Sequence, residues 1–234
     1  PDPVLPGASP NRPASRPATL GLLMLQTRFP RPPGDVGHPD TFAFAVRRRI
    51  VGGATPAAVV RARDPALLQP FIDAARALTD EGVDAIATSC GFLARWQGEL
   101  QSALPVPVWT SALLHLAELR GQRCGVITIE AASLGADELR AVGADPATPV
   151  EGITPLSPLH RTLLQDLPSL DVDDARDQVL AAARRLQRRV PDLQHLVLEC
   201  TNLPPYADAL RQACGLPVHD ITTLLRERMK ALQP

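Results

Sequence analysis

Two cysteines stand where an apolar run of the chain gives way to a loop. Cys90 ends the run "AIATSC" and Cys200 ends the run "LVLEC". A thiolate is a good base and nucleophile, and a thiol with a pKa of about 8.5 is a usable acid. Each cysteine also precedes a predicted helix, and the partial positive charge at a helix N-terminus favours the thiolate. The pattern therefore predicts a proton-transferring thiol at the end of each of two strands.

The two cysteines belong to an internal repeat. A shift of 110 positions, without gaps, places Cys90 on Cys200 and Pro107-Val108 on Pro217-Val218. Further pairs share this register: Leu93 with Leu203, Trp96 with Tyr206, Leu100 with Leu210, Ala103 with Ala213, and Leu114 with Leu224. A duplicated unit of this kind predicts two lobes related by a pseudo-twofold axis. Because ligands of open α/β sheets bind beyond the carboxyl ends of the strands, we expect both thiols to face one cleft between the lobes.

The elements that must position the thiols alternate along the chain. Short apolar runs separated by segments of helical periodicity predict an α/β fold with mainly parallel sheets. We expect a first lobe over residues 19–110 and a second over residues 111–220, with a C-terminal helix at about 221–232 packing back on the first lobe. Residues 1–18 are rich in proline and contain few large apolar side chains, so we expect a disordered or loosely attached tail. Residues 155–170 are interpreted as a mobile connection.

Composition excludes several classes of function. The net charge of −1 gives no electrostatic reason to expect a nucleic acid or an anionic membrane as a partner. No apolar run approaches the roughly 20 residues of a membrane span, and the start of the chain shows no secretory signal. The 4 cysteines form no Cys-x-x-Cys pair and no zinc-ligand spacing with histidine, so we expect reduced thiols, no metal and a cytoplasmic protein. The absence of a Gly-x-Gly-x-x-Gly stretch disfavours a dinucleotide cofactor.

Two thiols on opposite faces of a substrate can invert a stereocentre, because one removes a carbon-bound proton and the other returns one. The stretches "ATSCGF" and "LECTNLPPYADAL" resemble the aspartate/glutamate racemase superfamily, and the resemblance covers about residues 19–230. It implies two Rossmann-like lobes with the active site in the cleft between them, and no cofactor or metal. It also implies that Cys90 and Cys200 are the catalytic pair, one in each lobe.

The resemblance also names residues for substrate binding. It implies that Thr201 and Asn202 contact the substrate, while Gln26 and Thr27 lie in the first substrate loop. Four further residues complete the predicted site. Ser89, Gly91 and Phe92 stand beside the first cysteine, and Thr128 lies at the end of another predicted strand. Glu130, further along, is interpreted as a solvated loop carboxylate.

Two departures from the family pattern leave the substrate open. Gly91-Phe92 stand where glutamate and aspartate racemases usually have Asn-Thr, and Asn202 stands where they have His or Glu. We therefore expect a cofactor-independent racemase or epimerase of a small amino acid or related carboxylate. The alternatives are an isomerase of the maleate type, a hydantoin racemase, a decarboxylase of the arylmalonate type, or a two-lobed small-molecule-binding protein without catalysis. The expected partner is a small carboxylate, with a homo-oligomer as one alternative for the assembly.

Overall fold

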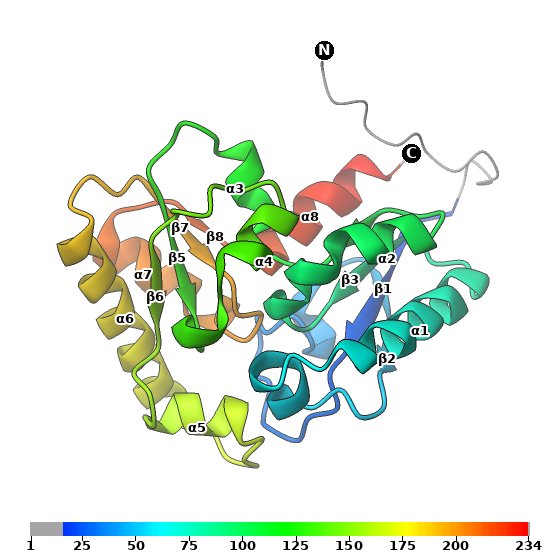
Figure 1. Ribbon diagram of the computed structural model, residues 1–234, viewed down its shortest axis with the longest axis horizontal. Coiled ribbons are helices and arrows are strands. Elements are labelled where there is room, and N and C mark those ends of the chain that lie inside the picture. The colour runs from blue at the N-terminus through cyan, green and yellow to red at the C-terminus, as the bar shows by residue number, and fades with distance from the viewer. Residues whose placement is uncertain (1–15, 234) are drawn as a thin grey trace.

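The computed structural model describes residues 16–233, which contain two four-stranded parallel sheets (Figure 1). The first sheet has the order β2-β1-β3-β4 and the second the order β6-β5-β7-β8. The strands of the first sheet are β1 (Thr19–Met24), β2 (Ala45–Ile50), β3 (Ala85–Thr88) and β4 (Val108–Trp109). Those of the second are β5 (Cys124–Thr128), β6 (Val150–Gly152), β7 (His195–Leu198) and β8 (Val218–His219). The predicted α/β class with two Rossmann-like lobes is confirmed.

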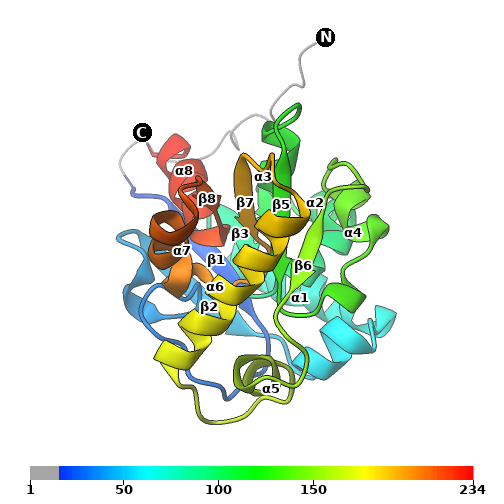
Figure 2. The ribbon, with the colours of Figure 1, turned by 90° about the vertical axis from the view of Figure 1, so that its left-hand side faces the viewer.

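The helices cover the sheets from outside, as the βαβ pattern requires. They are α1 (Leu68–Asp80), α2 (Gln97–Ala103), α3 (Leu114–Glu118), α4 (Ala136–Ala141), α5 (Pro158–Leu164), α6 (Val172–Arg189), α7 (Ala207–Cys214) and α8 (Ile221–Ala231). The long helix α6 lies across the second sheet, in contact with β5 and β6 (Figure 2). It begins at Asp171, whose side chain accepts hydrogen bonds from the amides of Asp173 and Asp174 and so caps the helix.

The repeat in the sequence appears as a repeat of structure. The strands β3 and β7 start 110 residues apart, and so do α2 and α7, and β4 and β8. The sheet order supports the same correspondence, because each cysteine strand lies between the first strand of its sheet and a two-residue edge strand. Cys90 and Cys200 therefore follow equivalent strands of the two sheets.

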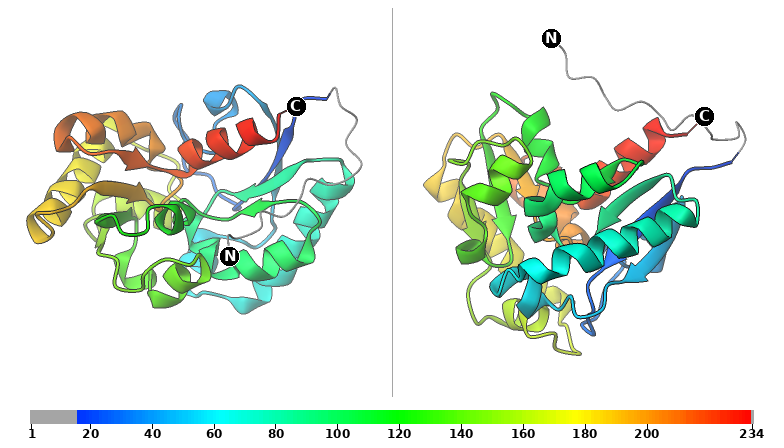
Figure 3. Two further views of the ribbon diagram at one scale, coloured as in Figure 1. Left: turned by 90° about the horizontal axis from the view of Figure 1, so that it is seen from above. Right: turned by 45° about the vertical axis from the view of Figure 1, so that its right-hand side comes forward.

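The last helix links the two halves of the chain. Seen from above, α8 runs from β8 toward the strands of the first sheet (Figure 3). Arg226 of α8 donates a hydrogen bond to the carbonyl oxygen of Thr41 at 3.0 Å, and its guanidinium lies 5.7 Å from the ring centre of Phe42. Arg228 of the same helix pairs with Glu118. Helix α8 thus contacts residues of both halves of the chain, and the predicted domain bounds stay a prediction.

The expectation of a mobile connection over residues 155–170 is wrong. This segment contains α5, which buries Leu159, Leu163 and Leu164. Pro158 occupies the first turn of the helix, where its missing N–H costs nothing. The leucines recur at helical spacing, and Pro155 before the helix and Pro158 at its start obscured this periodicity.

Most of the proposed tail, residues 1–15, lies outside the described residues. The part that is described is attached: Arg16 forms an ion pair with Asp84 at 2.9 Å, and Ala18 is fully buried. Within residues 16–233 no helix has the length and apolar character needed to cross a membrane.

Candidate active site

Both predicted catalytic cysteines line one pocket between the sheets, at the carboxyl ends of their strands. Cys90 follows β3 and Cys200 follows β7, and the space beside them, including the part open to solvent, is about 370 Å³. The two cysteines are buried to nearly the same degree, with 7% and 6% of their surface exposed. The two thiols therefore border the same space from opposite lobes.

Some features around Cys90 oppose ionisation of its thiol, and others favour it. Burial raises the pKa of its thiol to about 12, and the charge of Glu199 contributes to this rise. The backbone N–H of Phe92 and the positive charges of Arg95 and Arg31 act in the other direction and favour the thiolate. The expected thiolate-stabilising effect of a helix N-terminus is therefore outweighed by burial in this structure.

More negatively charged groups act on Cys200 than on Cys90. Burial raises the pKa of its thiol well above the ordinary value, and the charges of Glu199, Cys90 and Asp35 raise it further. The backbone N–H of Asn202 favours the thiolate, as that of Phe92 does for Cys90. The two thiols thus share the same contact with an amide two residues ahead, but the charges around them differ. The charged groups around Cys90 thus include two that favour its thiolate, whereas those around Cys200 all oppose ionisation.

Asn202 connects Cys200 to the loop between β1 and β2. Its Oδ1 accepts a hydrogen bond from Cys200 Sγ at 3.7 Å, and its Nδ2 donates to Asp35 Oδ2 at 2.7 Å. Asp35 is fully buried and also accepts from Arg31 at 2.9 Å and from the amide of Gly37 at 2.8 Å. The hydrogen bond between Asn202 and Asp35 fixes the loop of the first lobe against the second thiol.

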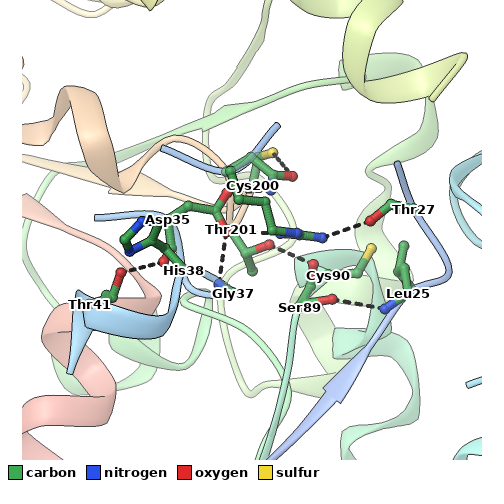
Figure 4. Close-up of polar contacts among 12 residues, drawn as sticks. Leu25, Thr27, Asp35, Gly37, His38, Thr41, Ser89, Cys90, Cys200 and Thr201 are labelled. Atoms are coloured by element: carbon green, nitrogen blue, oxygen red, sulfur yellow. Dashed lines mark hydrogen bonds and ion pairs between the residues drawn. The ribbon is translucent and has the colours of Figure 1, made fainter. Parts of the chain in front are cut away.

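Thr201 and Ser89 join the two cysteine loops directly. Thr201 Oγ1 donates to the carbonyl oxygen of Ser89 at 2.6 Å, and Figure 4 shows this bond between the segments that carry Cys200 and Cys90. Ser89 Oγ accepts from the amide of Leu25 at 2.9 Å, which leaves its hydroxyl hydrogen to donate. Both side chains line the pocket. Thr201 therefore holds the loops together as well as bordering the site.

The remaining walls of the pocket are mostly apolar. Apolar side chains from both lobes line it: Leu25, Phe29, Pro56, Val60, Phe92, Ile129, Leu163 and Leu164. Two of them come from α5, which lies at the lower edge of the molecule in Figure 1. The sequence predicted Phe92 for the site but missed Phe29 and α5, because neither stands next to a cysteine or another reactive group.

Glu199 is a polar residue of the pocket that the sequence analysis did not predict. It lines the pocket with a fully buried carboxyl group, and its Oε2 accepts a hydrogen bond from Thr128 at 2.6 Å. A signal was present in the sequence, since a carboxylate at the end of the apolar run "LVLEC" has no reason to be there for packing. Thr128 does not line the pocket itself and acts on Glu199 instead.

Two other predicted residues lie away from the pocket lining. Gln26 is exposed, and its side chain accepts a hydrogen bond from the amide of Gly53 at 3.0 Å. Thr27 accepts from Arg31 at 3.1 Å. The structure therefore brings Ser89, Gly91, Phe92, Thr201 and Asn202 to the two cysteines, and does not bring Gln26, Thr27 or Thr128 into the lining.

The interpretation of Glu130 as a solvated carboxylate is wrong. Its Oε2 lies 3.2 Å from Arg61 and 3.3 Å from Nε2 of the buried His160. The amide of Leu156 donates to His160 Nδ1 at 3.2 Å, so Nε2 carries the ring hydrogen of the neutral form. Glu130 therefore joins α5 to the first lobe.

Among the described residues, one group brings metal-ligand atoms together. His115, Glu118 and Glu227 place theirs within 4.8 Å of one another. Glu118 already pairs with Arg228, and His115 Nε2 lies 3.2 Å from Thr223 Oγ1. The donors are thus engaged with other groups, and the cluster does not line the pocket.

The sequence and the fold match known proteins. The Asp/Glu/Hydantoin racemase family matches residues 52–228, a range that includes both pocket cysteines. A dimethylsulfoniopropionate lyase from Durusdinium sp. clade D is 30% identical over 243 residues, which cover 92% of this chain and 74% of that protein. In fold, the chain is similar to allantoin racemase from Klebsiella pneumoniae, with a TM-score of 0.60 and 17% identity over 92% of this chain and 87% of the other. It is also similar to unliganded arylmalonate decarboxylase, with a TM-score of 0.59 and 16% identity over 93% of each chain. The chain belongs to the Asp/Glu/Hydantoin racemase family.

Proposed function

We propose that this protein is a lyase that eliminates dimethyl sulfide from dimethylsulfoniopropionate or a close analogue, with Cys90 as the base. The proposal is supported by the similarity to the Durusdinium lyase over 92% of the chain. The chemistry of the pocket supports it independently. It remains within the predicted superfamily but differs from the isomerase that the cysteine pair led us to expect.

The observation that carries the proposal is a pair of buried thiols in a pocket without a basic lining. Among the described residues that line it, there is no lysine or arginine, and two are aromatic: Phe92, and Phe29, whose ring already lies 4.7 Å from the Arg31 guanidinium. Dimethylsulfoniopropionate has a carboxylate at one end and a sulfonium cation at the other. Aromatic faces attract such cations. The positive charge that would stabilise a thiolate here is then supplied by the substrate.

The reaction needs one base. The Cys90 thiolate removes a proton from the carbon next to the carboxylate, and the electron pair of that C–H bond forms a double bond to the next carbon. The bond from that carbon to the sulfonium sulfur breaks, and its electron pair leaves with dimethyl sulfide. The other product is acrylate, and Cys90 becomes a thiol that must lose its proton before the next turnover. Arg31 and Arg95 assist because both favour the thiolate of Cys90.

The test is product formation by the purified chain. With dimethylsulfoniopropionate, we expect dimethyl sulfide by gas chromatography and acrylate by liquid chromatography in equal amounts. Cys90→Ser should lower the rate by about a hundredfold or more, because a serine hydroxyl is a poor base. Cys214→Ser is the matched control, since Cys214 lies on α7 and does not line the pocket. No product from the wild type, or full activity in Cys90→Ser, would overturn the proposal.

A racemase or epimerase is the second candidate, and the second thiol favours it. Cys200 has the same amide contact as Cys90 and lines the same pocket from the other lobe. A racemase would exchange the α-proton of aspartate, glutamate or a hydantoin with solvent. Incubation with each enantiomer in D₂O, followed by NMR and chiral chromatography, distinguishes this activity from elimination.

A further inference from the structure

Glu199 has one oxygen engaged and one oxygen without a partner. Oε2 accepts the hydrogen bond from Thr128, whereas Oε1 is buried and makes no hydrogen bond to the described residues. The carboxyl group lines the pocket and acts electrostatically on both Cys90 and Cys200. Buried polar atoms are usually paired, so an unpaired oxygen at the pocket wall points to a missing ligand.

The unpaired oxygen lies against the loop that follows the other thiol. A Cβ atom at Gly91 would overlap both the carbonyl oxygen and Oε1 of Glu199. Any larger residue at this position would therefore push the two cysteine loops apart. Gly91 also lines the pocket, and the amides of its loop are where we expect a substrate carboxylate to bind. Oε1 thus reaches from the second lobe to the expected carboxylate position.

Burial, and to a smaller extent the neighbouring Glu138, favours the neutral form of Glu199. The titratable groups that face it are Cys90, Cys200 and Glu138, all of them acids, and no described cation forms an ion pair with it. Glu138 itself pairs with Arg63 at 2.6 Å. Burial raises the pKa of Glu199 to about 8, Glu138 adds to the rise, and the Thr128 hydroxyl offsets part of it. Glu199 therefore holds a proton at neutral pH.

We propose that Glu199 is a further catalytic residue, a neutral carboxylic acid whose Oε1 donates a hydrogen bond to the carboxylate of the substrate. This inference rests on the proposed function only for the identity of that carboxylate. The proton stays on Glu199 throughout, and the carboxyl group neither gains nor loses a bond. Its hydrogen bond strengthens as negative charge grows on the substrate carboxylate during removal of the α-proton. An ionised Glu199 would instead repel the substrate.

The protonation state can be measured without any turnover. We expect the infrared spectrum of the wild type at pH 6.5 to contain a carboxylic-acid carbonyl band that disappears as the pH rises through about 8. The band should be absent from Glu199→Gln. It should persist in Glu138→Gln, the control for a second buried carboxyl group. If the wild type shows no such band at pH 6.5, Glu199 is ionised and the inference fails.

The hydrogen bond is tested with acrylate, a carboxylate that carries no sulfonium. By calorimetry, the affinity of the wild type for acrylate should fall about tenfold for each pH unit above about 8, because each binding event then requires one proton. Glu199→Gln should bind acrylate with an affinity that does not change in this range, since the amide donates at every pH. Glu199→Met, which cannot donate, should bind about tenfold more weakly throughout.

The outcomes separate this inference from the proposed function. If acrylate binds as described but dimethylsulfoniopropionate is not cleaved, the proposed function fails and the role of Glu199 stands. If the lyase is active but the acrylate affinity of the wild type does not depend on Glu199 ionisation, the role of Glu199 fails alone. A third result would also contradict the role of Glu199. If Glu199→Gln loses affinity for dimethylsulfoniopropionate but not for acrylate, then Glu199 is ionised and pairs with the sulfonium.

Discussion

At the scale of single residues, the two thiols occupy equivalent positions but have different charged groups around them. Their exposures are almost the same, so access does not distinguish them. Cys90 has Arg31 and Arg95 in its surroundings, whereas Cys200 has Asp35. The two halves are therefore alike in the position of the thiol but not in the charges around it, and in the proposed reaction this difference makes Cys90 the base.

This difference predicts the order in which the thiols react. Iodoacetamide reacts with thiolates, so we expect it to modify Cys90 before Cys200, at a rate that rises with pH. Peptide mapping by mass spectrometry measures both rates in one sample. The other buried cysteine, Cys124, serves as the internal reference. Earlier modification of Cys200 would contradict the assignment of Cys90 as the base.

At the scale of elements, α5 and the residues after it close the pocket. Asp166 follows α5 and has a positive φ of 55°. Its carboxylate accepts hydrogen bonds from the amides of Arg28 and Phe29, the latter at 3.1 Å. Phe29 lines the pocket, as does Leu163 of α5. The ion pair between Asp166 and the exposed Arg28 side chain contributes little by itself, so the amide contacts are what hold the loop.

Removal of the Asp166 carboxylate should make the wall of the pocket more flexible and weaken substrate binding, while the catalytic step is affected less. Asp166→Gly tolerates the positive φ but has no acceptor, so we expect faster hydrogen exchange at Arg28 and Phe29 and an increase in KM of about fivefold or more. kcat should change less. Asp166→Asn is the matched control, because asparagine also tolerates this conformation and still accepts from the amides. Equal effects of the two substitutions would show that the charge, and not the amide contact, is responsible.

At the scale of the whole molecule, buried ionic contacts join the lobes behind the site. The 3-10 helix Gly91–Trp96, after the first thiol, packs against α4 of the second half. Beside this contact, Arg63 pairs with the fully buried Glu138 at 2.6 Å and donates to the carbonyl oxygen of Ser133 at 3.0 Å. A carboxylate buried in this way needs its partner, because without it the desolvation cost is not compensated.

We therefore expect the two lobes to unfold together. Arg63→Met should lower the free energy of unfolding by about 3 kcal/mol, because it leaves the charge of Glu138 buried and unpaired. Denaturant unfolding followed by circular dichroism should show one transition in both proteins. Adding Glu138→Gln to Arg63→Met should restore much of the loss. Two separate transitions, or no rescue, would show that this contact does not couple the lobes.

The sequence by itself determined the framework of this protein. Apolar periodicity is a local property, and it sufficed for the α/β class and for the strands β3 and β7 that carry the thiols. The register of 110 residues also placed Cys90 and Cys200 in equivalent positions, because duplicated units fold in the same way. Residues next to the cysteines, such as Ser89 and Thr201, could be predicted for the same reason: covalent connection keeps them near the thiols.

Only the tertiary structure decided what else surrounds the thiols. Leu163 of α5, Phe29 and the Asp35 contact of Asn202 come from segments far from either cysteine, and no local pattern specifies which distant segments will meet. Gln26 and Thr27 show the converse, since the loop after β1 turns their side chains to Gly53 and Arg31. The protonation of Glu199 is likewise a tertiary property. Burial, with a smaller contribution from Glu138, raises the pKa of this carboxyl group to about 8. The run "LVLEC" marks the carboxylate as unusual, but it does not show that folding removes it from water.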